Sequence, residues 1–174
     1  VVNTNQPKGK MVQVLFEPNA KLTDSLTYDI TAWSIPYAYG LEAIASTSLV
    51  GTSAVGKTPV KNGKTVSATA YMMNWNNLKD VEFLANLLQQ GIKVRFTEKP
   101  MTTSGKSYTR GALIIVRGDN KSVENFDDKL IATANTYGRL LDAVASGFST
   151  AGPDFGSPDI KLVHPPKVAL LSGD

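Results

Sequence analysis

Residues 77–96, NLKDVEFLANLLQQGIKVRF, decide the fold that we expect for this chain. Asn77 with Asp80 three residues later is typical of a helix N-cap, and Gly91 is typical of a helix end. Apolar residues recur between them at helical spacing. They are Leu78, Val81, Leu84, Leu87 and Leu88. Because Ile92–Phe96 is typical of a strand, the stretch predicts a helix followed by a short strand.

The neighbouring segments extend this pattern on both sides. Val66–Asn74 and the apolar run Ala112–Val116 predict two more strands. A polar turn is expected around Ser104-Gly105. Ser122 or Asn125 is expected to open a long helix that ends at Gly147. Its apolar face would hold Leu130, Ala134, Tyr137, Leu141 and Val144. Strands alternating with amphipathic helices predict an α/β fold with a mostly parallel sheet covered by helices.

Three further segments have weaker patterns. Met11–Glu17 fits either a strand or a helix. Residues 28–44 favour a helix, with Pro36 expected to kink or break it. The apolar face of that helix would hold Ile30, Trp33, Tyr37, Leu41 and Ile44. In Val60–Val66, Asn62-Gly63 between β-forming residues predicts a β-hairpin insertion into the α/β fold.

The domain organisation is predicted from composition. We expect an α/β accessory domain over residues 1–151 and a Gly/Pro linker over residues 152–166. Strands are expected at Lys161–Val163 and Val168–Leu171, and residues 167–174 would begin a following domain. With Val1 in place of an initiator Met and an apolar run at the other end, both ends are expected to be cut.

The composition excludes several chemistries. Among 174 residues there is no Cys, which excludes disulfides, thiol nucleophiles and Cys-zinc sites. His164 is the single histidine, so no site with two or three His ligands is possible. The net charge of +3 is scattered, and we expect no nucleic-acid partner. No apolar stretch approaches the ~20 residues that cross a bilayer, so no membrane span is expected.

Residues 51–58, GTSAVGKT, match the phosphate-binding pattern G-x-x-x-x-G-K-[ST]. In a nucleotide site, Lys57 would contact the outer phosphates and Thr58 would bind magnesium. Such a site needs a helix after the loop, because the helix N-terminus supplies much of the anion binding. Pro59 and the expected hairpin follow instead. We therefore favour a polar loop over a nucleotide site.

Two other short motifs have a structural and a functional interpretation. Asn74, Trp75 and Asn77 lie between a strand and a helix, where α/β sheets bind ligands, so they are candidates for holding a peptide or a glycan. The alternative is that Trp75 covers the core and the amides cap the helix. Arg117-Gly118-Asp119 spells an integrin-recognition tripeptide, and we favour a turn after a strand.

Residues 28–40, YDITAWSIPYAYG, are distinctive when taken with Gln6-Pro7, residues 15–18 (LFEP) and residues 166–171 (PKVALL). In this order they resemble the region that follows the catalytic domain in large secreted bacterial zinc carboxypeptidases of the carboxypeptidase A superfamily. The resemblance runs from about Gln6 to Asp174. It implies a helix at Met11–Glu17 and a variable connection at the loop over residues 51–58.

The resemblance also implies a function. The larger protein to which this chain would belong, here called the parent, would hydrolyse C-terminal residues from peptides. Its zinc would be bound by His-x-x-Glu and a second His in a domain that precedes this chain. This chain has no His-x-x-Glu, so no catalytic or metal-binding residue is expected here, and the fragment itself needs no cofactor. The expected function is non-catalytic support for the peptidase domain and for an amidotransferase-like domain, or a homodimer contact, in a secreted or periplasmic protein. The alternative is a ligand-binding module.

Overall fold

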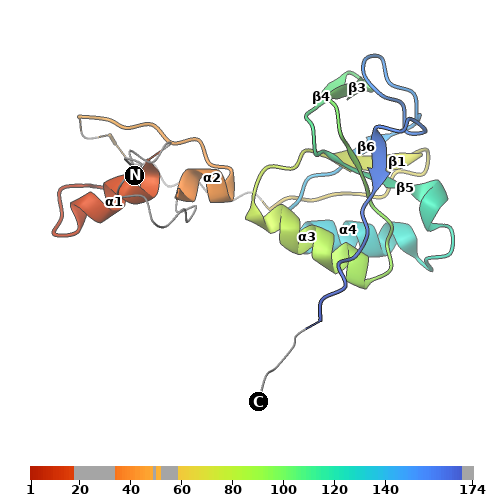
Figure 1. The fold of residues 1–174 in the computed structure, drawn as a ribbon, viewed down its shortest axis with the longest axis horizontal. Helices are drawn as coiled ribbons and strands as arrows, with labels where there is room; N and C mark the ends of the chain where they lie inside the picture. Colours follow the sequence, from red (N-terminus) through yellow and green to blue (C-terminus); the bar gives the residue numbers. More distant parts are fainter. Residues whose placement is uncertain (18–33, 49, 52–58, 170–174) are drawn as a thin grey trace. The chain divides into compact units, whose positions relative to one another are not determined.

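The computed structural model describes residues 1–17, 34–48, 50–51 and 59–169. The chain divides into two compact units. The first unit comprises Val1–Thr58 with Asn76–Lys79, and the second unit comprises Pro59–Trp75 with Asp80–Asp174. Helices and strands of both units are labelled in Figure 1.

The first unit has two described helices, α1 (Gly9–Phe16) and α2 (Ile35–Tyr39). The helix implied by the resemblance near Met11 is therefore confirmed. The helix predicted over residues 28–44 is wrong after Tyr39, and residues 28–33 lie outside the described part. Pro36 lies in the first turn of α2, where a missing N–H is tolerated, and Gly40 ends the helix at φ +59°.

The second unit has three further helical segments and seven strands within the described residues. They are β1 (Ala70–Met73), α3 (Leu78–Gln89), β2 (Arg95–Thr97), β3 (Met101–Thr103), β4 (Lys106–Tyr108), β5 (Leu113–Val116), the short 3-10 helix η1 (Arg117–Asn120), α4 (Phe126–Thr136), β6 (Asp142–Val144) and β7 (Ile160–Leu162).

The main sheet has the order β6-β1-β5-β2-β7, and all neighbouring strands are antiparallel. Because β1 and β2 both run antiparallel to β5, they run in the same direction with β5 between them. In the same way, β5 and β6 share a direction and are separated by β1. Two β-α-β motifs, β1-α3-β2 and β5-α4-β6, thus interlock. This is the double split β-α-β arrangement called ferredoxin-like. β7 extends this sheet beyond β2.

The predicted mostly parallel sheet is therefore wrong. The β-α-β order along the chain is confirmed, but each pair of parallel strands is separated by a strand from the other β-α-β motif. Hydrophobic periodicity indicates which faces of a strand are buried. It does not indicate which strands are neighbours in the sheet. The apolar character of β5 results from burial on both faces, which does not require a parallel sheet.

The predicted hairpin at Val60–Val66 is also wrong, because these residues form no strand. The hairpin of this unit is instead β3–β4. Its two-residue turn is Ser104-Gly105, with φ of 51° and 73°, as a type I′ turn requires. The turn predicted at this position is confirmed.

Alternate residues of β1 and β5 enter two separate cores. Tyr71, Met73, Leu113 and Ile115 face α3 and α4, where they pack against Phe83, Leu87, Leu130 and Ala134. Ala70, Met72 and Ile114 face the opposite side, where Met101, Tyr108 and Phe155 cover them. Figure 1 shows α3 and α4 together on one side of the sheet and the β3–β4 hairpin on the other.

Both long helices are confirmed, with two corrections. The buried line of α3 is Asp80, Phe83 and Leu87, whereas Leu78 and Val81, predicted to be apolar contacts, are exposed. The predicted continuation of α4 to Gly147 is wrong. Gly138 ends this helix at φ +63°, and the Arg139 N–H donates to the Ala134 carbonyl at 2.7 Å, as in a Schellman motif.

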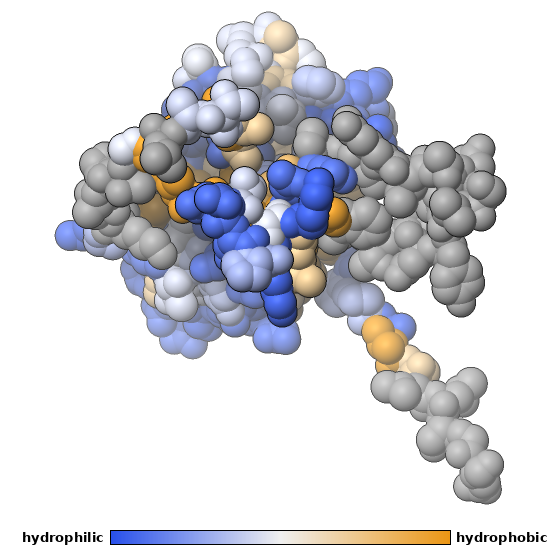
Figure 2. Space-filling view, turned by 90° about the vertical axis from the view of Figure 1, so that its left-hand side faces the viewer, coloured by the Kyte–Doolittle hydropathy of each residue, from blue (hydrophilic) through white to orange (hydrophobic). Residues whose placement is uncertain are grey.

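No described helix is long and apolar enough to cross a membrane. On the face drawn in Figure 2, the coloured surface is mainly hydrophilic, and its hydrophobic residues form small separate areas. Isolated apolar residues of this kind are normal on protein surfaces.

Candidate functional site

The residues predicted for ligand binding have structural contacts where they are described. The Asn74 side-chain oxygen accepts a hydrogen bond from the Thr109 N–H at 2.9 Å. Trp75 is half-buried against the helix-side core. The Asn77 side-chain oxygen accepts from the Lys79 N–H at 2.9 Å, so Asn77 is the N-cap of α3. Their role in ligand binding stays a prediction. Lys57 and Thr58 lie outside the described residues.

The Arg117-Gly118-Asp119 tripeptide forms η1 directly after β5. Asp119 accepts two hydrogen bonds from Arg95, at 2.6 and 3.0 Å. This bond and the nearby charge raise the pKa of Arg95, although partial burial opposes the shift. Because both charged ends of the tripeptide are engaged inside the unit, the interpretation as a turn is confirmed.

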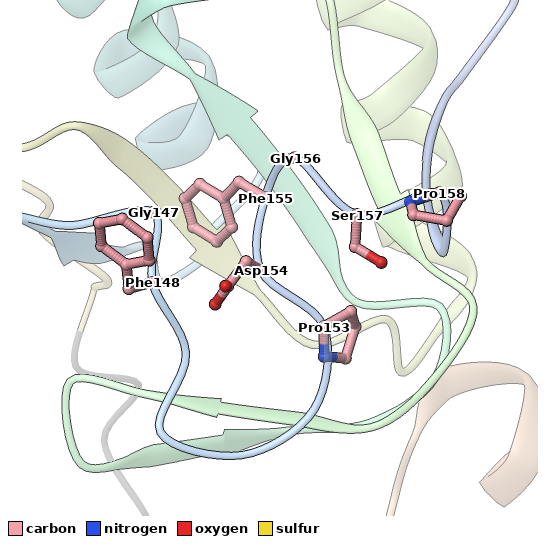
Figure 3. Close-up of a pocket in the computed structure, with 8 residues that line it drawn as sticks. All are labelled: Gly147, Phe148, Pro153, Asp154, Phe155, Gly156, Ser157 and Pro158. Atoms are coloured by element: carbon pink, nitrogen blue, oxygen red, sulfur yellow. The ribbon is translucent and has the colours of Figure 1, made fainter.

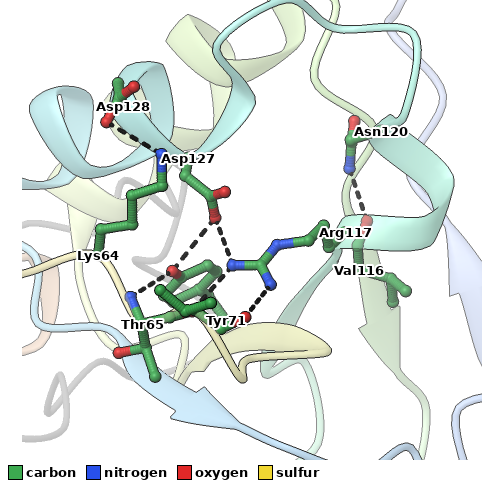
Figure 4. Close-up of polar contacts among 9 residues, drawn as sticks. Lys64, Thr65, Tyr71, Val116, Arg117, Asn120, Asp127 and Asp128 are labelled. Atoms are coloured by element: carbon green, nitrogen blue, oxygen red, sulfur yellow. Dashed lines mark hydrogen bonds and ion pairs between the residues drawn. The ribbon is translucent and has the colours of Figure 1, made fainter.

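Arg117 is the centre of a polar cluster that Figure 4 shows. Its guanidinium donates to an Asp127 carboxylate oxygen at 2.7 Å and to the carbonyls of Thr65 and Val66 at 2.9 and 2.8 Å. The Tyr71 hydroxyl donates to the same Asp127 oxygen at 3.2 Å and accepts from the Thr65 N–H at 3.1 Å. The cluster thereby joins η1, α4, β1 and the segment before β1.

The chemistry of this cluster is structural. The hydrogen bond to Asp127 raises the pKa of Arg117, so the guanidinium stays charged. Tyr71 is 1% exposed, which leaves its hydroxyl out of reach of a substrate. An acid, a cation and a hydroxyl are present together, but their hydrogen bonds are directed to one another and to the backbone.

Another ion pair connects α3 to the chain after α4. The Arg139 guanidinium donates to the Asp80 carboxylate at 2.9 Å, and Asp80 is 1% exposed. Arg139 also donates to the Tyr137 carbonyl at 3.0 Å. The sequence pattern placed Asp80 only in a helix cap and assigned no partner to Arg139.

Asn62 makes the contacts that no sequence pattern indicated. Its side-chain NH₂ donates to the Asn135 side-chain oxygen and to the Arg139 carbonyl, each at 2.8 Å. Its side-chain oxygen accepts from the Leu141 N–H at 2.8 Å. Asn62 thus pairs with the end of α4 and the start of β6 as a backbone amide would. We call this arrangement the Asn62 clasp.

A third cluster joins the hairpin to the sheet edge. The Tyr108 hydroxyl donates to Asp142 at 3.0 Å, and Lys106 forms an ion pair with the same carboxylate. Burial and the bond to Asp142 raise the pKa of Tyr108 well above its ordinary value. Tyr108 is therefore a neutral hydrogen-bond donor, and β4 is held to β6.

One cavity of about 710 Å³ lies along the loop between β6 and β7 (Figure 3). It is lined by Gly147, Phe148, Pro153, Asp154, Phe155, Gly156, Ser157 and Pro158. Asp154 accepts from the Ser149 N–H at 2.6 Å and fixes the loop. Thr102 of β3 pairs with the backbone of Thr150 and Ala151, which holds the loop on the hairpin. The segment predicted to be a linker, residues 152–166, includes the later part of this loop and β7.

The described residues contain no group of three His, Asp or Glu side chains that could hold a metal ion. With one His and no Cys in the whole sequence, a zinc site with two His ligands does not fit this chain. No catalytic step can be derived through zinc here.

No protein-family model, curated protein or solved structure matches the chain. The second unit has a double split β-α-β fold. The described polar clusters connect helices, strands and loops within this unit. The resemblance to zinc carboxypeptidases rests on the sequence segments quoted above.

Proposed function

We propose that this chain is a non-catalytic accessory domain of a larger zinc carboxypeptidase-like protein. Its role is to support the peptidase domain and to separate it from a following amidotransferase-like domain. The parent removes C-terminal residues from peptides, is secreted or periplasmic, and carries its zinc in the peptidase domain. The proposal rests on the sequence resemblance and on the ion pairs that charged side chains form with one another within the described residues.

The use of charged side chains is the observation that supports this proposal. Seven ion pairs lie within the described residues, and each joins two different elements or loops of the second unit. An active site needs an acid, base or nucleophile that faces a substrate. Here the buried carboxylate of Asp80 faces Arg139, and the half-buried carboxylate of Asp127 faces Arg117 and Tyr71. Such an arrangement favours a rigid support over catalysis.

The rigid loops supply a second argument. The β3–β4 hairpin is held to β6 by Tyr108 and Lys106, and to the loop between β6 and β7 by Thr102. A domain that sets the distance between its neighbours needs loops that are fixed to its core. The contacts of the β3–β4 hairpin and of the loop between β6 and β7 support this role.

The test compares three proteins: the chain alone, the peptidase domain alone, and the two in one polypeptide. We expect chelator-sensitive release of C-terminal residues from a peptide only where the peptidase domain is present. We also expect the joined protein to melt at a higher temperature than the isolated peptidase domain, with kcat/KM within about threefold, because uniform structural support changes no transition-state contact. Chelator-sensitive hydrolysis by the chain alone would contradict the proposal.

The observed cavity favours one alternative, a ligand-binding module. The cavity is wide open to solvent. Its volume of about 710 Å³ falls in the range of small-molecule sites, and Phe148 at its edge is 78% exposed. Isothermal titration with peptides and glycans separates the two functions. Saturable binding that is lost in Phe148→Ser and retained in Trp75→Phe would favour this alternative.

A further inference from the structure

We propose that Asn62 is a site of spontaneous deamidation, and that the reaction releases the segment over residues 59–65 from α4. Asn62-Gly63 is the only Asn-Gly pair in the sequence. The pair lies in the Asn62 clasp and not in a hairpin turn.

The reaction needs only water. The Gly63 backbone nitrogen attacks the side-chain carbonyl carbon of Asn62 and forms a five-membered succinimide ring. The side-chain nitrogen leaves as ammonia and takes with it the proton from the Gly63 nitrogen. Water then opens the ring at either carbonyl, which gives aspartate or isoaspartate. The net change is one amide and one water converted to one carboxylate and one ammonium ion.

The nucleophile is accessible. Gly63 is exposed, and no atom lies within 4 Å of the position that a Cβ would occupy. Within the described part of the chain, its N–H makes no hydrogen bond. Since glycine has no side chain, neither bulk nor a restricted backbone opposes ring closure at this nitrogen.

The electrophile is locked in the folded state. Both side-chain N–H groups of Asn62 are bound, to Asn135 and Arg139, and its oxygen is bound by Leu141. The Asn62 backbone N–H also donates to the Asn135 side chain at 2.7 Å. Attack requires the side chain to rotate toward Gly63, which breaks this set. The reaction therefore follows local opening of the clasp.

The product cannot rebuild the clasp. A carboxylate has no N–H, so an oxygen would face the Asn135 oxygen and the Arg139 carbonyl, two acceptors that were 2.8 Å from the lost nitrogen. The new negative charge would also lie beside the C-terminal end of α4, where the helix dipole disfavours an anion. The Arg139 guanidinium is already bound to Asp80 and offers no compensation.

The experiment incubates the folded chain at mildly alkaline pH and maps deamidated peptides by mass spectrometry. A synthetic peptide of residues 58–68 gives the rate in the absence of the clasp. We expect conversion at Asn62 ahead of Asn86 and Asn135, at least tenfold slower in the folded chain than in the peptide. Asn135→Ala removes the three hydrogen bonds between the Asn135 side chain and Asn62. It should increase the folded-state rate about tenfold, given the usual strength of such bonds.

Two further measurements keep the proposal falsifiable. Urea below the unfolding transition should accelerate the reaction in the unmutated chain, which covers the case in which Asn135→Ala fails to fold. In Asn62→Asp, hydrogen exchange over residues 137–143 should be about tenfold faster than in the unmutated chain, because the clasp is lost. Equal rates in the folded chain and the peptide, no conversion under any condition, or unchanged exchange in Asn62→Asp would each overturn it.

Discussion

The Asp80 carboxylate on α3 lies 2.9 Å from the Arg139 guanidinium, which follows α4. The two residues are far apart in the sequence, and the pair joins the two helices that cover the same face of the sheet. Asp80 is 1% exposed and occupies a position that an apolar residue would usually hold. A buried charge of this kind is tolerated only with a partner.

Asp80→Asn should therefore destabilise the second unit by about 3 kcal/mol, because an amide cannot supply the negative charge that the buried Asp80 carboxylate presents to the partly buried guanidinium of Arg139. Asp128→Asn is the matched control. Asp128 also lies in the first turn of a helix, but it pairs with Lys64 at 3.6 Å on the surface, which predicts less than about 1 kcal/mol. Urea unfolding measures both variants. Equal losses would contradict a special role for the buried pair.

Gly152 should not tolerate a side chain. Its φ is +85°, and a Cβ there would meet the backbone around Pro100 and Met101. We expect Gly152→Ala to cost about 2 kcal/mol or more, since a left-handed conformation alone costs about 1–2 kcal/mol for alanine. Gly156→Ala is the control, because no atom lies within 4 Å of its Cβ position. Thermal melting of both variants is the measurement, and a similar melting temperature for the two would refute the expectation.

Two phenylalanines along the same cavity should behave differently. Phe155 is 8% exposed and packs in the hairpin-side core, whereas Phe148 is 78% exposed. Phe155→Ala should cost about 3 kcal/mol through the lost burial and the cavity left behind. Phe148→Ala should change the free energy of unfolding by less than about 0.5 kcal/mol. If denaturant curves show a large loss for Phe148→Ala, then that ring has a packing role that its exposure does not reveal.

Alkaline pH should weaken the fold through Tyr108. Burial, followed by the hydrogen bond to Asp142, raises its pKa above the ordinary value near 10. The stabilising effect is complete below pH 10 and is lost as the pH rises, because the unfolded chain releases the proton first. From this residue alone the loss approaches about 1.4 kcal/mol per pH unit. Tyr108→Phe should lack this component, so its unfolding free energy should fall less steeply above pH 10. Parallel profiles for the two proteins would disprove the assignment.

Local sequence signals predicted many of the elements correctly. Asn77 caps α3, and Gly91 ends it, with the Ile92 N–H donating to the Leu87 carbonyl at 2.9 Å. Ser104-Gly105 forms the expected turn. The end of α4 has the same local signal, because Gly138 has a positive φ as Gly91 does. These features depend on residues a few positions apart, and so a pattern along the chain can indicate them.

The tertiary structure alone decided which strands are neighbours and which polar residues meet. The chain order β-α-β is the same whether the parallel strands are adjacent or separated, and here β5 lies between β1 and β2. Asn62 pairs with Leu141 across 79 residues, and its Asn-Gly sequence pointed to a hairpin instead. Strand pairing and buried hydrogen bonds depend on which surfaces meet when the whole unit packs. Periodicity, capping and turn chemistry act locally, so the sequence by itself determined the elements and the packed fold determined their partners.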